Sequence, residues 1–266
     1  MDFTIKSYRS LIESLQISGY TFLPFRDYIT TTNKELRTTD RIIILRHDVD
    51  DLKLNSLRFA KIQNELGIKG TYYFRIIPES FDESVIKQIA DLGHEIGYHY
   101  EEIDIISSRF RVQSSEEELI DEAWKLYKEN LEKIRKVADV RTICAHGSPL
   151  SRFNNNLIWK KYSYKEFGII GDPDITTDWN EVAYLTDTGR RWNGDSVSVR
   201  DKVKSKQNFN FKSTFDIVNN VDKLPDKVMF TIHPERWNDN ILMWTEELVT
   251  QNIKNVIKKW FFVKHS

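Results

Sequence analysis

The sequence predicts an α/β protein of about seven parallel strands, arranged as a closed or nearly closed (β/α) barrel, with an open doubly wound sheet as the alternative. Short β-rich apolar runs alternate with stretches of helical spacing, the order expected of parallel strands joined by helical crossovers. Polar clusters follow five of these runs directly, as they do where the carboxyl ends of parallel strands line a site. The predicted strands are residues 41–47, 70–76, 95–99, 142–146, 167–171, 182–186 and 228–233.

The segments between these runs carry the signals of helices. Two stretches of apolar residues at helical spacing stop at Gly67 and Gly93, where a left-handed helix cap belongs. Ser114 and Ser115 offer hydroxyl caps to a long helix whose first turn is acidic. The expected helices cover residues 54–66, 85–92, about 114–137 and 240–259, and a short apolar stretch follows at 260–263.

The composition is that of one ordinary globular chain, with 266 residues, 40% hydrophobic and 30% charged. No linker or repeat divides it, so one domain over 1–266 is expected, with 1–40 as a helical or extended addition to a barrel over 41–266. The single Cys144 excludes an internal disulfide framework and zinc sites of two or four thiolates. A net charge of −1 gives no general reason to expect nucleic acid or anionic membrane as a partner.

The amino-terminal segment bears on localisation. It carries charges at Asp2, Lys6, Arg9 and Glu13 and has no apolar stretch long enough for a signal sequence. The longest aliphatic run, residues 42–45, is far shorter than the ~20 residues that a membrane-spanning helix requires. A cytoplasmic protein without a membrane span is therefore expected.

Acids and histidines stand at the ends of the predicted strands. Asp48 and Asp50 would share one face, so one can bind a cation while the other acts as a general base; capping of the next helix is the alternative. Asp50 with His99 and His146 would hold a divalent metal and leave open positions for water and substrate. His233 would then be free as a general acid, with a satisfied core histidine as the alternative.

Two further features complete the sequence-based picture of the site. His94 and His99 are five residues apart and face opposite ways on a strand, so His94 is expected to be a structural turn histidine. A substrate pocket is predicted from Arg190, Arg191, Trp192 and Asp178, because guanidinium groups hold carboxylates or phosphates and indole rings stack on sugars. Packing of the tryptophans and surface ion pairs of the arginines are the alternatives.

The order of RHDVDD, GTYYF, GHEIGYH and TIH resembles the polysaccharide deacetylases of the NodB-homology type, carbohydrate esterase family 4, over residues 41–233. The resemblance implies a distorted (β/α) barrel and the metal-dependent removal of acetyl from an N-acetylated sugar. It implies that Asp48 is the base, Asp50 and His99 are metal ligands and His233 is the acid. It also implies a divalent metal cofactor, for which zinc is expected.

The sequence departs from the family pattern near the metal ligands. One residue stands between the two acids, no glycine follows them, and the family's Arg-x-Pro loop is replaced by HGSP at residues 146–149. The family's second metal histidine would fall at Ile103, so His146 or Glu102 is considered as its replacement. The chain resembles a branch associated with bacterial surface-polysaccharide biosynthesis, which implies a small-molecule substrate, a nucleotide- or lipid-linked sugar.

A metal-dependent carbohydrate N-deacetylase is therefore the predicted function. The first alternative is a catalytically silent carbohydrate-binding barrel that has lost part of the metal site. The second is a related C–N hydrolase acting on a small cyclic amide or formyl group. No nucleic acid partner is predicted, and no oligomeric state.

Overall fold

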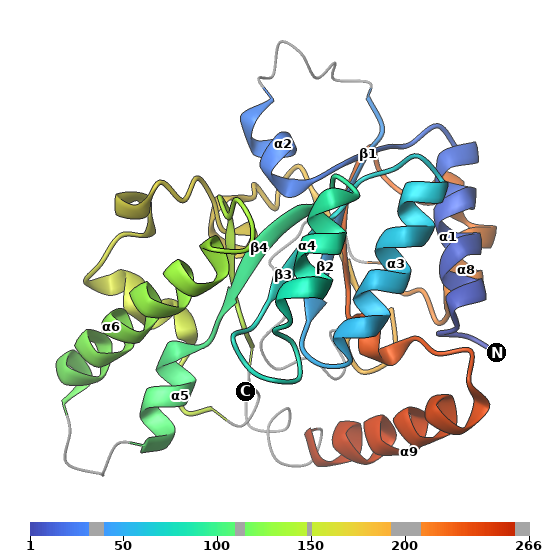
Figure 1. Cartoon of the computed structure of the whole chain (residues 1–266). Coiled ribbons are helices and arrows are strands. Elements are labelled where there is room, and N and C mark those ends of the chain that lie inside the picture. Colours follow the sequence, from blue (N-terminus) through green and yellow to red (C-terminus); the bar gives the residue numbers. More distant parts are fainter. Residues whose placement is uncertain (32–39, 110–114, 148–150, 193–208, 259–266) are drawn as a thin grey trace.

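The structure is a computed structural model and describes residues 1–31, 40–109, 115–147, 151–192 and 209–258. Seven strands form one sheet, every strand pair is parallel, and helices cover the sheet, which confirms the predicted α/β class (Figure 1). The strands are β1 (Thr21–Leu23), β2 (Ile42–Val49), β3 (Thr71–Phe74), β4 (Glu95–Tyr100), β5 (Ile143–Ala145), β6 (Ala183–Thr186) and β7 (Lys227–Ile232).

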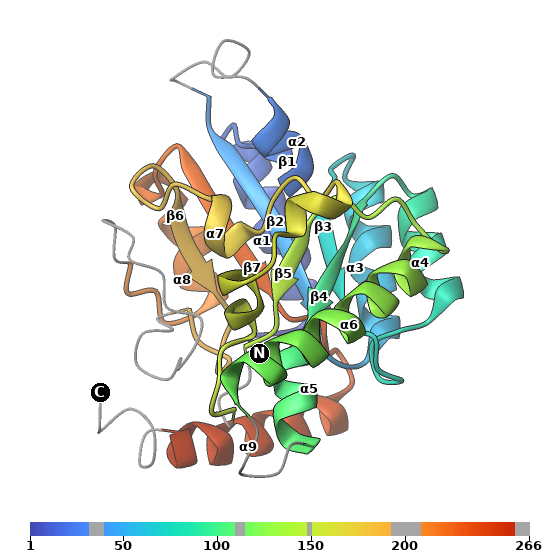
Figure 2. The same cartoon turned by 90° about the vertical axis from the view of Figure 1, so that its left-hand side faces the viewer.

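The sheet follows the order β5-β4-β3-β2-β7-β6, with β1 beside the first half of β2. On one edge of β2, residues 42–44 pair with β1 and residues 46–49 pair with β3. The sheet curls, and within the described residues no pairing joins β5 to β6 (Figure 2). The fold is thus the predicted distorted (β/α) barrel, left open between these two strands.

β2 is the central strand and bears the first half of the site. All eight of its residues are buried, as expected of a strand with neighbours on both edges and cover on both faces. Its amino-terminal half is aliphatic, whereas Arg46, His47 and Asp48 stand near its carboxyl end. Buried ionisable groups at this end require partners, and those partners build the site.

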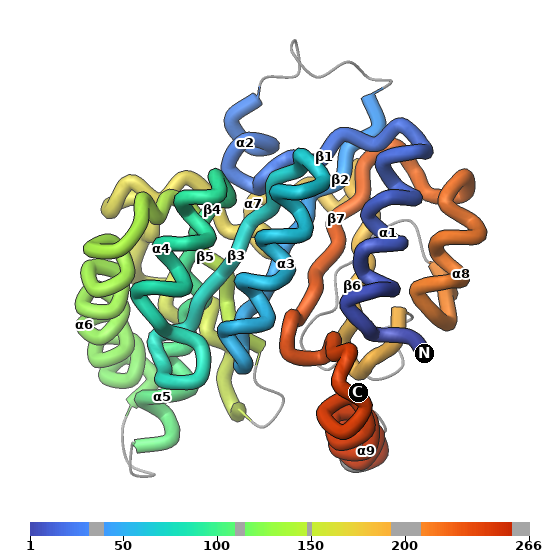
Figure 3. Tube along the Cα trace, turned by 45° about the vertical axis from the view of Figure 1, so that its right-hand side comes forward, coloured from blue at the N-terminus to red at the C-terminus, as the bar shows by residue number. Residues whose placement is uncertain are grey.

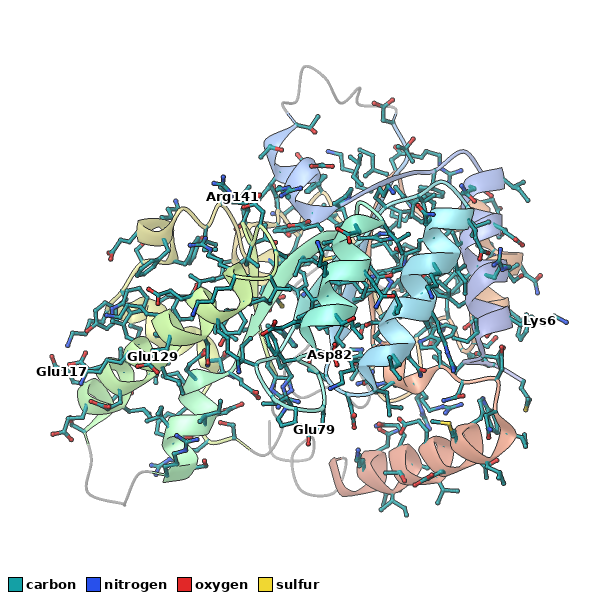
Figure 4. All side chains as sticks on the ribbon, in the orientation of Figure 1. Lys6, Glu79, Asp82, Glu117, Glu129 and Arg141 are labelled. Carbon is teal, nitrogen blue, oxygen red and sulfur yellow. The ribbon has the colours of Figure 1, made fainter. Side chains whose placement is uncertain are left out.

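Helices pack along the outside of the curled sheet, and α9 lies across its carboxyl end (Figure 3). In Figure 4, Glu79 and Asp82 mark this carboxyl end and Arg141 marks the amino end. The helices are α1 (Ile5–Ile17), α2 (Phe25–Thr30), α3 (Lys53–Glu65), α4 (Glu83–Asp91), α5 (Glu102–Arg109), α6 (Glu116–Arg135), α7 (Pro173–Thr176), α8 (Thr214–Asn219) and α9 (Ile241–Lys258). Short 3₁₀ helices include η1 (Asn155–Lys160), η2 (Tyr164–Phe167) and η5 (Pro234–Arg236).

The predicted helix signals are confirmed where they can be compared. Gly67 and Gly93 follow α3 and α4 with φ of 69° and 84°, the left-handed conformation expected of a cap. Ser115 caps α6 through a capping box with Glu118. Residues 260–263, expected to follow the last helix, lie outside the described residues.

The predicted strand at 167–171 is wrong. η2 ends at Phe167, Gly168 has a φ of 67°, and of the described residues in this stretch Gly171 alone bridges to the sheet, at Thr142. Ile169 is buried from this irregular segment, so the apolar pattern reflects packing and not pairing.

β1 was not predicted, because three residues carry too little alternation to show. It pairs with β2 in the same sheet, so the first forty residues contribute a strand to the barrel. The sequence had predicted a barrel that begins at residue 41. Among the described residues, no helix is long and apolar enough to cross a membrane.

Candidate metal and catalytic centre

The residue directly after each of six strands carries an ionisable side chain. Parallel strands present their carboxyl ends at one edge of the sheet, so these six side chains are brought to the same end of the molecule. They are Asp50 after β2, Arg75 after β3, Glu101 after β4, His146 after β5, Asp187 after β6 and His233 after β7.

Asp48 is held by a forked ion pair with Arg46. Side chains alternate along β2, so Arg46 and Asp48 share one face, and the Arg46 Nε and Nη2 atoms donate to the two Asp48 oxygens at 2.8 and 2.7 Å. Burial would raise the pKa of Asp48, but the Arg46 charge outweighs it and lowers the pKa to about 2. Asp48 is therefore an oriented carboxylate at neutral pH, and each oxygen keeps a second lone pair.

His47 points to the opposite face of β2 and has a structural role. Its ring stacks on Tyr72 at 4.1 Å between centroids, and its Nδ1 donates to the Thr71 carbonyl at 3.0 Å. Burial lowers the pKa of His47 to about 3. His94 is also structural: its Nδ1 accepts from the Gly70 amide and its Nε2 lies 3.0 Å from the Ala60 carbonyl oxygen.

Asp50, His99 and His146 converge. The Oδ1 atom of Asp50 lies 3.4 Å from His99 Nε2 and 3.8 Å from His146 Nε2. Ligand atoms on a tetrahedral zinc ion are about 3.3 Å apart when the bonds are about 2.0 Å long, so each imidazole is near enough to Asp50 to share a cation with it, although the three ligand atoms do not all lie within 4.8 Å of one another.

A hydrogen bond on His99 and a close carboxylate beside His146 lie at the far side of each ring from Asp50. His99 Nδ1 lies 3.0 Å from the Cys144 carbonyl oxygen, which can only accept, so Nδ1 carries the hydrogen and Nε2 of the neutral ring is a lone pair. His146 Nδ1 lies 3.2 Å from Glu101 Oε2. Partners of this kind orient the ligating histidines of metal sites.

His99 Nε2 and Asp50 Oδ1 are 3.4 Å apart, and a positive charge between them, either a proton on the ring or a bound cation, makes this contact favourable. Within the described residues, Asp50 Oδ1 is buried and accepts no well-formed hydrogen bond although both imidazoles are near. Burial raises the pKa of Asp50, but the two histidines outweigh it and hold the pKa well below its usual range. The residues therefore fit a divalent cation bound to Asp50.

Glu101 and Arg75 support His146 and were not predicted from the sequence. Arg75 Nη2 donates to Glu101 Oε2 at 2.5 Å, the same oxygen that lies beside His146. Burial raises the pKa of Glu101, but hydrogen bonds to His146 and Arg75 lower it overall. Glu101 is thus an anion that positions the His146 ring.

Glu102, considered from the sequence as a replacement ligand, points away from Asp50. It is buried, accepts a hydrogen bond from the Tyr98 hydroxyl, and accepts another from Asn130 Nδ2 at 2.9 Å. Burial raises the pKa of Glu102 to about 7. The structure therefore brings His146, and not Glu102, to the ion-binding group.

Cys144 lies beside the same group. Asp48, His99 and Cys144 each offer a ligand atom within 4.8 Å of the other two, a second geometry in which a metal could be held. The Cys144 thiol, however, lies 2.6 Å from Arg46 Nη2, and burial raises its pKa well above the usual range. A metal held there would have to displace the Arg46 contact and deprotonate the thiol, whereas Asp50 is already an anion whose Oδ1 accepts no hydrogen bond within the described residues.

His233 is paired with Asp187, which is fully buried. Asp187 accepts from the His233 amide at 3.0 Å, from its Nδ1 at 2.6 Å and from Trp237 Nε1 at 2.7 Å. Burial and Arg236 lower the pKa of His233, but Asp187 outweighs them and raises it to about 9. His233 is consequently an imidazolium at neutral pH, with Nε2 free to donate a proton.

Within the described residues, Arg190 is the one of the four predicted substrate residues with a contact to this centre, since its amide donates to the Asp187 carbonyl at 2.8 Å. Trp192 is buried in the core and donates to Thr214 Oγ1 at 3.0 Å. The Arg190 guanidinium lies over the Trp244 ring at 4.8 Å. Arg191 is exposed, and Asp178 is exposed before the amino end of β6, where it accepts from Asn180. Trp192 and Arg190 thus have packing contacts. For Trp192, packing was the alternative to substrate binding that the sequence offered.

No family model matches the sequence, and no curated protein matches it. Solved structures do match. Streptococcus pyogenes deacetylase PplD, solved in complex with acetate, aligns at 13% identity and a TM-score of 0.42 over 58% of this chain and 66% of that one, just under two thirds of its length. Bacillus subtilis PdaA, a family 4 carbohydrate esterase, aligns at 14% identity and a TM-score of 0.42, over 93% and 83% of the two chains.

BA3943, a family 4 pseudoenzyme from Bacillus anthracis, aligns at 14% identity and a TM-score of 0.44, over 86% of this chain and 68% of that one. The solved structures to which the chain is similar therefore include members of the family that its motifs resemble. They include both enzymes and a pseudoenzyme.

Proposed function

We propose that this protein is a metal-dependent hydrolase that removes the acetyl group from an N-acetylated sugar. The observation that supports this most directly is Asp50 Oδ1, which lies between two imidazole Nε2 atoms and accepts no hydrogen bond within the described residues. A base and an acid flank this group, in Asp48 and His233. A carbohydrate-binding barrel without activity has no need of either.

Asp50, His99 and His146 would hold a divalent ion, for which zinc suits one carboxylate and two imidazoles. When bound, such an ion supplies a Lewis acid that polarises an amide carbonyl and makes a nearby water more acidic. Glu101 and the Cys144 carbonyl hold the two rings in place for this purpose. Cys144 would remain a thiol.

Asp48 would take a proton from the attacking water. Its Oδ2 lies 3.9 Å from His99 Nε2, so it stands beside the ion-binding group without sharing the Asp50 position. The forked contact with Arg46 holds the carboxylate plane in one orientation and keeps it ionised. A positioned general base of this kind contributes about 10²- to 10⁴-fold in rate.

His233 would protonate the sugar nitrogen as the carbon–nitrogen bond breaks, because an amine leaves readily only after protonation. His233 follows β7, the neighbour of β2 in the sheet, and its charge lowers the pKa of both Asp48 and Asp50, which supports its pairing with the base. Asp187 keeps the imidazolium protonated at neutral pH.

We propose a nucleotide- or lipid-linked sugar as the substrate, and a place in bacterial surface-polysaccharide biosynthesis in the cytoplasm. The motif resemblance supports this choice. The same centre is able to hydrolyse a small cyclic amide or formyl group, and substrate comparison separates the two.

The test is the Asp48→Asn variant, assayed for acetate release from nucleotide-linked N-acetylated sugars. Activity should fall about 10²- to 10⁴-fold while bound metal, measured on the same sample, stays within about tenfold in affinity. Asp91→Asn, an exposed carboxylate at the end of α4, is the matched control and should behave as wild type. Parallel loss of metal and activity in Asp48→Asn would make Asp48 a ligand and overturn its assignment as base.

A further inference from the structure

Helix α9 exposes an apolar face. Leu242, Val249, Ile253 and Val256 are 77, 52, 57 and 57% exposed. Their spacings of seven, four and three residues keep all four on one side of a helix. Val249, Ile253 and Val256 adjoin one another on this face, whereas the exposed Glu246 lies between Leu242 and Val249; grouped apolar surface of this kind marks an interaction site in a folded protein.

The face of α9 that packs on the body is held by polar contacts. Gln251 and Asn255 are each only 6% exposed. Asn255 Nδ2 donates to the Gly189 carbonyl at 2.9 Å, and Trp244 Nε1 donates to the Asp2 carbonyl at 2.7 Å. A surface helix normally buries its apolar side and exposes its polar side; α9 does the reverse along this stripe. The exposed stripe is therefore not explained by packing within the described residues.

The stripe lies at the end of the molecule that carries the candidate site. α9 crosses the carboxyl end of the sheet, close behind His233 and η5 in the chain (Figures 1 and 3). Leu52 and Leu54, where β2 passes into α3 at this same end, are also exposed. Among the described residues, eight of the thirteen exposed large apolar side chains belong to α9 or to this connection.

The chemistry of the surrounding chain indicates what covers the stripe. Residues 250–266 include four lysines and no acid, whereas the first half of α9 carries Glu246 and Glu247. The sequence after α9 continues Lys259, Trp260, Phe261, Phe262, the mixture of cationic and aromatic residues found where chains meet the headgroup region of a bilayer. With 18 residues and no membrane-spanning character, α9 suits lying in that region and not crossing it.

A second copy of the chain fits this surface less well. Four aliphatic side chains form the stripe, whereas a stable interface has roughly 20 to 30 residues on each side. We propose that α9 docks on an anionic lipid bilayer, with Leu242, Val249, Ile253 and Val256 entering the headgroup boundary. The mouth of the barrel then faces the membrane surface.

This orientation narrows the substrate class to a sugar carried on a lipid. That consequence rests on the proposed function, whereas the docking of α9 on a bilayer does not depend on it. The test therefore measures membrane binding alone. Wild-type protein is sedimented with vesicles of phosphatidylglycerol and phosphatidylethanolamine, and with vesicles of phosphatidylcholine, and its mass in solution is measured in the absence of lipid.

We expect binding to the anionic vesicles and weaker binding to phosphatidylcholine. The double variant Val249→Gln/Ile253→Gln should reduce the partition coefficient by at least about tenfold, because two half-exposed aliphatic side chains lose their transfer into lipid. The matched control, Ile17→Gln/Phe215→Gln, replaces two exposed apolar residues on other helices and should bind as wild type. Lys254→Gln should weaken binding to anionic vesicles only, a second readout that leaves the stripe intact.

Three outcomes overturn the proposal. If wild-type protein stays in solution in the presence of anionic vesicles, the protein has no membrane-binding surface. Equal partition of the stripe variant and its control places the surface elsewhere. A lipid-free dimer that the stripe variant dissociates, without vesicle binding by the wild type, assigns the stripe to a second copy of the chain.

Discussion

The charge of His233 depends on one buried carboxylate. Asp187 raises the pKa of His233 to about 9 against the opposing effects of burial and Arg236. Asp187→Asn removes the larger raising charge and leaves Glu235 against the lowering effects of burial and Arg236, so the pKa of His233 should fall by at least about one unit. The alkaline limb of a kcat/KM profile should move to lower pH by the same amount.

The same substitution has a predicted effect on stability. A histidine whose folded pKa is raised stabilises the fold fully below its unfolded value of about 6.5, and that stability is lost as pH rises through about 9. Asp187→Asn should therefore weaken this dependence over pH 6.5–9. An unchanged alkaline limb in the variant would show that Asp187 does not set the proton of His233.

At this scale, the sequence predicted some contacts and not others. Strand alternation was sufficient to place Asp48 and Asp50 on one face and His94 away from His99. The contact of Glu101 with His146 joins two different strand ends and needs the pairing of β4 with β5. Arg75 was assigned to a strand interior because the predicted strand ran two residues too far.

At the scale of the element, Gly97 explains part of the GHEIGYH motif. A Cβ at this position would lie 2.3 Å from the ring of Tyr73, the fully buried residue of β3 that pairs with Gly97. Gly97→Ala should therefore lower the free energy of unfolding by about 1–3 kcal/mol through overpacking, measured by urea denaturation.

Gly67→Ala is the comparison for Gly97→Ala. A Cβ added at Gly67 would meet no atom within 4 Å, but the residue has a φ of 69°. The substitution should therefore lower the free energy of unfolding only by the strain of the left-handed conformation, about 1 kcal/mol. Stability equal to wild type in Gly97→Ala would mean that β3 and β4 can separate to admit a methyl group.

Elements were predictable where their signals are local. Caps and periodic apolar residues identify α3, α4 and α6, because a helix satisfies its hydrogen bonds within one segment. β1 depends on its pairing with residues 42–44 of β2, far along the chain. The stretch 167–171 had the apolar residues of a strand, but Gly168 takes a left-handed conformation and ends the regular backbone there.

At the scale of the whole molecule, a bound metal should stabilise the fold. An ion that binds only the folded chain adds about 2.7 kcal/mol to the free energy of unfolding when it is present at about 100 times its Kd. Zinc should therefore raise the Tm of wild-type protein, and a chelator should reverse the change. Asp50→Asn should show no such response, and an equal response in that variant would place the ion elsewhere.

The general architecture could be predicted because strand and helix alternate throughout the chain. The open edge between β5 and β6 could not, since closure depends on how far the sheet curls. The third member of the ion-binding group was also left open by the sequence, between His146 and Glu102. Only the structure shows Glu102 turned toward Tyr98 and Asn130.

We propose that Asp50, and not Cys144, anchors a divalent ion beside His99 and His146. Metal content per chain, measured by mass spectrometry on purified wild-type, Asp50→Asn and Cys144→Ser proteins loaded with zinc, tests it most directly. We predict a single ion in the wild type and in Cys144→Ser and none in Asp50→Asn. Metal retained by Asp50→Asn would show that Asp50 does not anchor the ion, and metal lost from Cys144→Ser would show that Cys144 does.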